Sequence, residues 1–164
     1  MAMKAVVCKQ FGPPESLVVE ELPSPAPGPG EVVISVKAAS VNFPDVLIIQ
    51  NKYQFKPPLP FSPGSELAGV VKEVGAEVRN VRPGDRVMAF TTYGAFAEEV
   101  KTEATRLVPL PEAMEFVTGA AFLLTYGTDD QVFPNTALSG FELLRAYRAG
   151  FLGGGSQCDV GIDG

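Results

Sequence analysis

The sequence predicts a mainly β protein with short helices, an α+β fold in which the strands form a small, partly open β-barrel. Short valine-rich runs alternate with proline and glycine turns up to Pro111, and this spacing is typical of small barrels. Helical spacing of apolar residues begins only after Pro111. The 15 prolines and 17 glycines follow no collagen-like period, so they are expected at turns.

The N-terminal part predicts strands and one short helix. The strands are expected at residues 4–9, 17–22 and 32–38, and the last of these alternates apolar with more polar residues, as a half-exposed strand does. The segment PSPAPGPG before it is expected to be stiff and extended. The helix is expected at residues 44–50, with Asn42 as its N-cap and Pro44 in its first turn.

The rest of the chain predicts further strands and then helices. Strands are expected at residues 66–74 and 85–90, joined by the type II turn Arg82-Pro83-Gly84-Asp85, then near residues 96–100 and at 106–108. A capping box from Ser139 to Glu142 predicts a late helix that stops at Gly150. An earlier amphipathic helix is predicted by apolar residues at helical spacing, namely Met114, Val117, Ala120, Ala121 and Leu124.

Composition and charge exclude several classes of function. The net charge is −6 and the basic residues are scattered, which argues against nucleic acid and anionic membranes as partners. No apolar run is long enough to span a bilayer, so we expect a soluble, cytoplasmic protein. The chain has no histidine, and its two cysteines, Cys8 and Cys158, lie far apart. Histidine-based triads and zinc sites are therefore excluded, and no metal site is expected.

One carboxylate lies in an apolar run. Glu66 occurs within the stretch PFSPGSELAGVV. A buried carboxylate needs a metal, a cation or hydrogen-bond donors beside it, and the pattern alone leaves these alternatives open.

A series of motifs carries a family resemblance. The segments are MKAVVCKQFGPPESL, PGPGEVVISVKAASVNFPDVLIIQNKY, PFSPGSELAGVVKEVGAEV, VRPGDRV, GAFAEEV and PEAMEFVTGAAFLLTYGT. From Met3 to Thr128 they resemble, in order and spacing, the quinone oxidoreductase (zeta-crystallin-like) branch of the medium-chain dehydrogenase/reductase superfamily. The resemblance implies a GroES-like barrel, which is the N-terminal half of a two-domain NADPH-dependent reductase.

The resemblance also bears on whether the protein binds zinc. Zinc-dependent members of the superfamily have a cysteine at the position of Asn42 and Gly-His-Glu at the position of Gly64-Ser65-Glu66. The resemblance therefore implies a zinc-independent protein. Glu66 is then expected to accept hydrogen bonds from backbone amides or hydroxyls at the cleft.

The resemblance implies catalytic roles for Asn42 and Tyr53, and cofactor binding by Asn42, Asp45 and Thr125. Asn42 would hydrogen-bond an acceptor oxygen, and Tyr53 would stack on the ring or donate a proton. Each residue also has a purely structural explanation: a helix cap for Asn42, the helix dipole for Asp45, a rim position for Tyr53 and a bond to the preceding turn for Thr125. Asn51 replaces a common family glycine, and asparagine tolerates the left-handed backbone that such a turn requires.

The implied reaction is hydride transfer from NADPH to a quinone or an α,β-unsaturated carbonyl compound, without zinc. An alternative is an enoyl-thioester reductase of the same superfamily, in which an enoyl thioester accepts the hydride. A non-catalytic binding or assembly module is an alternative of a different class, and a co-chaperonin is a weaker one because only the barrel is shared.

Two segments are expected along the chain. Residues 1–128 would form the barrel with its following helix, and residues 129–164 would form an atypical tail. Such a tail would result from a truncation, a frameshift or an alternative ending of the chain. A dinucleotide-binding Rossmann domain is expected to be absent or truncated, because no strand precedes Gly153-Gly154-Gly155. The isolated chain is therefore expected to be inactive. The exposed face of the 114–124 helix is expected to drive association or aggregation, and a homodimer formed through the tail is compatible with the sequence.

Overall fold

The computed structural model describes residues 2–124. The chain divides into two compact units, residues 1–125 and 126–164, and every element described here belongs to the first. Thr125, the capping box at Ser139 and the glycine run at residues 153–155 lie outside the described residues.

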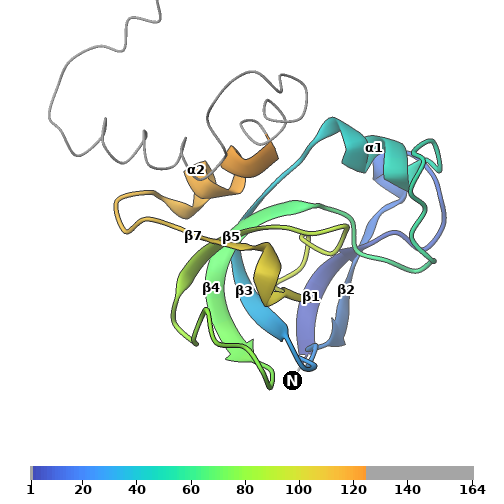
Figure 1. Cartoon of the computed structure of the whole chain (residues 1–164). Coiled ribbons are helices and arrows are strands. Elements are labelled where there is room, and N and C mark those ends of the chain that lie inside the picture. The colour runs from blue at the N-terminus through green and yellow to red at the C-terminus, as the bar shows by residue number, and fades with distance from the viewer. Residues whose placement is uncertain (1, 125–164) are drawn as a thin grey trace, which may run out of the picture. The chain divides into compact units, whose positions relative to one another are not determined.

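The first unit consists of two antiparallel sheets and two short helices (Figure 1). Strands β1 (Ala2–Val7) and β2 (Val18–Pro23) form one sheet. The other has the order β6-β3-β4-β5-β7. Its strands are β3 (Glu31–Ser40), β4 (Glu66–Val74), β5 (Arg86–Phe90), β6 (Glu99–Glu103) and β7 (Leu107–Pro109). The helices are α1 (Phe43–Ile49) and α2 (Phe116–Ala120), and 3-10 turns occur at Pro14–Ser16 and Ala104–Arg106. The prediction of a mainly β, GroES-like fold with a partly open barrel is confirmed.

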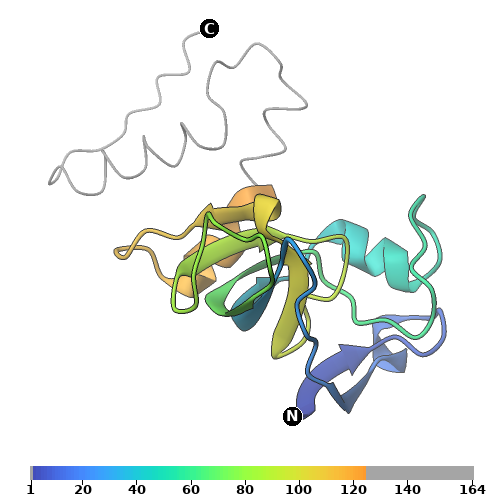
Figure 2. The same cartoon turned by 60° about the horizontal axis from the view of Figure 1, so that its bottom comes forward.

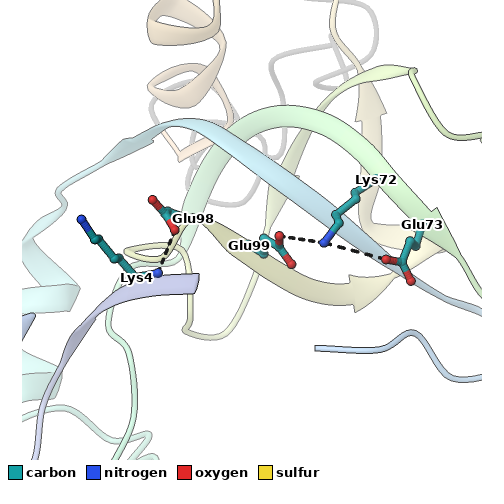
Figure 3. Close-up of polar contacts among 5 residues, drawn as sticks. All are labelled: Lys4, Lys72, Glu73, Glu98 and Glu99. Atoms are coloured by element: carbon teal, nitrogen blue, oxygen red, sulfur yellow. Dashed lines mark hydrogen bonds and ion pairs between the residues drawn. The ribbon is translucent and has the colours of Figure 1, made fainter. Parts of the chain in front are cut away.

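Residues 96–98 join the two sheets. The backbone N–H of Val6 donates to the carbonyl of Phe96 at 2.8 Å, and the N–H of Glu98 donates to Lys4 at 2.9 Å. On the other side, the N–H of Val36 in β3 donates to the carbonyl of Glu98 at 2.9 Å. Figure 3 shows that the Glu98 carboxylate also accepts the Lys4 backbone N–H, at 2.8 Å. The sheets are thus linked by a short bridge rather than closed into one continuous ladder.

An ion pair lies across the five-stranded sheet beside this bridge. The Lys72 ammonium of β4 donates to the Glu99 carboxylate of β6 at 2.8 Å, and Glu73 lies 3.8 Å from the same nitrogen (Figure 3). These contacts raise the pKa of Lys72, chiefly through the hydrogen bond to Glu99. The Lys72 and Glu99 side chains are 29% and 16% exposed, so water still screens the pair and its contribution to stability is small.

One hydrophobic cluster fills one face of the large sheet, and α2 covers buried residues of the other face, among them Ala68 and Met88. The buried residues of the cluster come from alternate positions of β3, β4 and β5, among them Val32, Ile34, Leu67, Val71, Val87 and Ala89. The expected alternation in β3 holds only in part, because Val33 is also fully buried. The pairing register with β4 shifts between Val33 and Ile34, and such a bulge interrupts the regular alternation of faces.

Helix α2 contacts β3, β4 and β5. Figure 2, like Figure 1, shows it in orange, away from the blue β1–β2 pair. Arg86 of β5 helps to place this helix, because its guanidinium donates to the backbone carbonyls of Glu112 and Met114. The same group lies 4.5 Å from the centre of the Phe116 ring. A cation over an aromatic face is a favourable arrangement.

Most predicted ends of strands and of α1 differ from the structure by one or two residues, and two predicted elements differ more clearly. The strand expected near residues 96–100 begins at Glu99, because residues 96–98 make the bridge between the sheets instead. The helix expected over residues 114–124 is interrupted at Ala121, whose ψ of 3° ends α2, and helical backbone resumes only at residues 122–124. The predicted apolar face is confirmed in part, because Met114 and Ala120 are buried whereas Val117 is 72% exposed. Gly119, which the prediction did not include, is also buried and lies close to Leu110.

Among residues 2–124, no helix is both long and apolar enough to cross a membrane.

Candidate functional site

The candidate site lies at one end of the large sheet, where β3 ends, β4 begins and β5 ends. Ser40, at the end of β3, pairs with Glu66 at the start of β4, and Glu66 pairs in turn with Phe90 at the end of β5. Directly opposed residues of antiparallel strands point to the same face of a sheet. The sheet therefore places a hydroxyl, a carboxylate and an aromatic ring in a row at one end.

The loop before β4 has a backbone that only glycine suits. Gly64 has φ of +89°, and a Cβ built on it would lie 2.4 Å from the Phe96 ring. The Gly64 carbonyl accepts the N–H of Ala95 at 3.0 Å, and the Ser65 carbonyl accepts the N–H of Thr91 at 2.6 Å. This tight approach holds the loop after β5 against the loop that leads into Glu66.

Glu66 is fully buried and accepts three hydrogen bonds. Its Oε2 accepts the Ser40 hydroxyl at 2.6 Å and the Asn42 side-chain amide at 3.3 Å. Its Oε1 accepts the backbone N–H of Leu124 at 2.7 Å. The expectation that Glu66 accepts bonds from a hydroxyl and a backbone amide is confirmed, and these donors stabilise the carboxylate away from water.

Asn42 is the N-cap of α1, as predicted, and forms a capping box with Asp45. Its side-chain nitrogen Nδ2 donates to Ser40 Oγ at 2.9 Å as well as to Glu66. Because Ser40 Oγ and Glu66 Oε2 lie only 2.6 Å apart, both acceptors face the same side of the amide nitrogen. The second N–H of the amide points away from them and keeps its capacity to donate to a ligand.

Asp45 is only 3% exposed and supports the Asn42 turn. Its carboxylate accepts the Asn42 backbone N–H at 2.8 Å and the Ser65 hydroxyl at 3.4 Å. Burial raises the pKa of Asp45 above its ordinary value, the nearby Glu66 charge adds to the rise, and the two hydrogen bonds oppose it. With both oxygens turned inward, the contacts of Asp45 are explained by the architecture of the turn.

Tyr53 lies apart from this network. It packs against the cluster of Cys8, Ile48, Ile49 and Phe61 beside α1, and within the described residues it makes no hydrogen bond. The left-handed turn expected at Asn51 is confirmed by its φ of 59°. The structure therefore brings Asn42, Asp45 and Glu66 together but leaves Tyr53 in a separate cluster.

An aromatic row that the motifs did not indicate continues from the Tyr53 cluster. The rings of Phe61 and Tyr93 meet edge to face at 6.0 Å, and Tyr93 stacks with Phe55 at 6.1 Å. Phe55 and Tyr93 are each 39% exposed. Only the fold brings these rings together, because Phe55 and Phe61 precede β4 whereas Tyr93 follows β5.

Ser40 and Ser65 are the other members of the network that the sequence did not single out. Ser40 lies two residues before Asn42, and residues at this spacing share a face of an extended chain. That spacing was the available signal for Ser40. No comparable pattern indicates that Ser65 bonds to Asp45.

The side chains at this end of the sheet do not suit zinc. Asn42 and Ser65 offer an amide and a hydroxyl, whereas zinc sites use thiolate, imidazole and carboxylate ligands. Both oxygens of Glu66 already accept hydrogen bonds. Residues 2–124 contain no group of three cysteine, aspartate, glutamate or histidine side chains placed to hold a metal.

Comparisons with known proteins agree with this architecture. Residues 28–112 match the family model described as alcohol dehydrogenase GroES-like domain. The chain belongs to this family, and its relatives place it among the medium-chain dehydrogenase/reductase proteins of the quinone oxidoreductase type.

Individual relatives support the assignment. Rat "quinone oxidoreductase-like protein 2" is 38% identical over 125 residues, which are 76% of this chain and 35% of that protein. The crystal structure of human synaptic vesicle membrane protein VAT-1 homolog-like protein aligns with a TM-score of 0.80 and 37% identity, covering 84% of this chain and 45% of that one. A mycobacterial protein solved in complex with NADPH aligns with a TM-score of 0.74 and 30% identity, covering 83% and 42%. The chain spans about a third of the length of the curated relatives it matches.

Proposed function

We propose that residues 2–124 form the barrel of a zinc-independent oxidoreductase, which transfers hydride from NADPH to a quinone or an α,β-unsaturated carbonyl compound. The observation that carries the proposal is the closed network around Glu66. A carboxylate that accepts bonds from Ser40, Asn42 and the Leu124 backbone holds the site together without a metal. Membership of the family and the likeness to quinone oxidoreductase-like relatives support the choice of reaction.

NADPH, when bound, supplies the hydride, so the barrel needs no side-chain nucleophile. The likeness to the mycobacterial protein solved with NADPH supports this cofactor. The residues at the end of the sheet fit its nicotinamide end. Asn42 offers a half-buried polar group, and its neighbours Val41 and Phe43 are 73% and 75% exposed apolar side chains. Such a surface suits a flat ring that carries one polar substituent.

The residues of this chain would then act in three ways. Asp45 and Glu66 hold the Asn42 turn and the Leu124 backbone in place, so that the site is formed before the ligand arrives. Phe55 and Tyr93 offer partly exposed rings to an aromatic acceptor. Tyr53 keeps a hydroxyl that no described residue engages, and we propose it as a proton donor to the reduced acceptor.

The direct test is an assay, by loss of NADPH absorbance with and without p-benzoquinone, of a chimera in which residues 2–124 replace the matching part of the mycobacterial protein solved with NADPH. The assay is repeated after dialysis against a chelator and after addition of zinc. Oxidation of NADPH that requires the quinone and does not respond to zinc supports the proposal. Activity that disappears on chelation and returns with zinc contradicts it, and so does oxidation of an alcohol in place of quinone reduction.

A further inference from the structure

Strand β3 is paired on both sides over only part of its length. β6 pairs with residues 31–35 of β3, and the last backbone bond on that side runs from the N–H of Val36 to the carbonyl of Glu98. On the other side, β4 pairs with β3 as far as Ser40. Among residues 2–124, no backbone group bonds to residues 38–40 on the side away from β4. β3 therefore ends in an open edge, which follows the shift in its register at Lys37.

The open edge carries unused hydrogen-bonding groups. Successive residues of an antiparallel strand direct their backbone N–H and C=O alternately to its two sides. At least one of Ala38, Ala39 and Ser40 therefore offers both a donor and an acceptor to this edge. An unpaired strand edge is a template for the backbone of another strand.

A groove with a volume of about 540 Å³ lies along this edge. One of its walls is residues 36–41 of β3, and the other is the β1–β2 sheet, where the paired residues Val6 and Val19 line it. Residues 95–98 connect the two walls. The lining is mostly apolar and rich in small side chains, namely Ala5, Ala38, Ala39, Ala95 and Ala97. Small side chains on both walls leave room for those of an added strand.

The charges in the groove favour an acidic partner. Lys4 and Lys37 both line it, and neither makes an ion pair with a described residue. Glu98 also lines the groove, but its carboxylate accepts the backbone N–H of Lys4, and Figure 3 shows the Lys4 ammonium pointing away from it. Two positive charges and one negative charge leave an excess of one positive charge, which a carboxylate on the partner complements.

We propose that this groove is the docking site for one extended strand of a partner polypeptide, which adds to the open edge of β3. Its alternate apolar side chains enter the groove, and an acidic residue meets the lysines. Main-chain bonds then supply the affinity and the groove supplies the selectivity. A second copy of the barrel does not fit, because its described strands are already paired in sheets and a groove between two walls admits a single strand. This interaction surface does not depend on the proposed reaction.

The first part of the test concerns the 164-residue protein alone. Exchange of its backbone amides with water is measured by NMR. We expect at least one amide among residues 38–40 to exchange about tenfold or more faster than the amides of residues 32–35, which lie where β3 is paired on both sides. Protection of all three amides in dilute protein would mean that another part of this chain occupies the edge. Protection that appears only at high protein concentration would mean that a second copy does. Either result would overturn the proposal.

The second part adds a strand as a probe. The peptide acetyl-EVTVTV-amide alternates apolar and polar residues and begins with a glutamate. We expect saturable binding, with NMR shifts and new amide protection at residues 38–40. Two derivatives carry N-methyl groups, one on the valines and the other on the threonines, so each keeps the side chains and loses the N–H donors of one edge. One derivative should bind about tenfold more weakly than the other. No binding of the parent peptide, or equal binding of the parent and both derivatives, would contradict strand addition.

A pair of substitutions locates the binding site. Val19 and Val117 are 70% and 72% exposed, but only Val19 lines the groove. We expect Val19→Gln to weaken binding of the peptide about fivefold and Val117→Gln to leave it unchanged. A peptide with lysine in place of its glutamate should also bind more weakly. An equal response to the two substitutions would place the peptide elsewhere, and tighter binding of the lysine peptide would contradict the acidic partner.

Discussion

The Glu66 carboxylate accepts the backbone N–H of Leu124 at 2.7 Å, between residues that are 58 positions apart in the sequence. The same side chain receives Ser40 and Asn42 through its other oxygen. One residue therefore connects the end of β3, the N-terminus of α1 and the segment after α2. The candidate site exists because this carboxylate gives three separate parts of the chain a common acceptor.

Removal of that acceptor should destabilise the protein. Glu66→Ala leaves the Ser40 hydroxyl, the Asn42 amide and the Leu124 N–H without their partner, and each buried unsatisfied group costs roughly 1–3 kcal/mol. We expect the free energy of unfolding to fall by about 3 kcal/mol or more, measured by urea denaturation. Glu21→Ala, at an exposed position of β2, is the matched control and should change it by less than about 0.5 kcal/mol. Equal effects of the two substitutions would show that the network does not stabilise the fold.

The loop before Glu66 should not tolerate a side chain at Gly64. Gly64→Ala combines a φ of +89° with a Cβ only 2.4 Å from Phe96, so both backbone strain and a clash are expected. Gly84→Ala is the comparison, because Gly84 has a similar φ of +96° and open space around it. We expect a loss of about 1 kcal/mol at Gly84 and a clearly larger loss at Gly64, both from urea denaturation. If Gly84→Ala were the more damaging change, the contact with Phe96 would not be important.

Asp45 should make stability depend on pH. Burial raises its pKa in the folded state, so the folded protein holds this proton more tightly than the unfolded chain does. The stabilising contribution is complete below the ordinary pKa of aspartate, roughly 4, and is lost as pH rises through the higher folded value. The difference in free energy of unfolding between the unmodified protein and Asp45→Asn should therefore shrink from pH 4 upwards. A difference that grows over this range would mean that the hydrogen bonds to Asp45, which lower its pKa, outweigh burial, which raises it.

Glu31 should show the opposite trend. Its hydrogen bond to Lys101, with the nitrogen and oxygen 2.9 Å apart, and the backbone N–H of Gly28 lower its pKa. A lowered folded pKa gives stability that is present above the ordinary pKa of glutamate and lost as pH falls through the folded value. Denaturation of Glu31→Gln beside the unmodified protein should show the two stabilities converging in acid. A gap that stays constant down to pH 3 would contradict the shift.

Asn51 tests the turn after α1. Its φ of 59° lies in the left-handed region, which glycine and asparagine adopt more readily than alanine. We expect Asn51→Ala to reduce the free energy of unfolding by about 1 kcal/mol, and Asn51→Gly to change it by less. Thermal or urea unfolding of the pair measures the difference, and the reverse order would show that the asparagine side chain itself is required.

Much of the fold is predictable because local patterns specify it. Valine-rich runs and proline or glycine turns predict most strands within a few residues, and Asn42 and Asn51 indicate the two ends of α1. The failures come from tertiary contacts. Residues 96–98 are extended but connect two sheets, and the helix after Pro111 packs through Gly119 and Ala120 because small residues allow a close approach.

The site was only partly predictable for the same reason. The resemblance indicates Asn42 and Asp45, and an isolated carboxylate in an apolar run indicates that Glu66 needs donors. The sequence does not show that those donors are Ser40 and the backbone of Leu124, because the pairing of β3 with β4 creates the first contact and the folding of the chain creates the second. The separation of Tyr53 from Asn42 is likewise a result of packing around Phe61.

The central claim is that residues 2–124 are a working reductase barrel without zinc. The most direct measurement is quinone-dependent NADPH oxidation by a chimera in which these residues replace the matching part of the mycobacterial protein solved with NADPH. That host is assayed in parallel. We predict that the folded chimera consumes NADPH when p-benzoquinone is present, is unaffected by a chelator, and loses activity with Glu66→Ala. A folded chimera that binds NADPH and reduces no quinone, while its host does, would contradict the account.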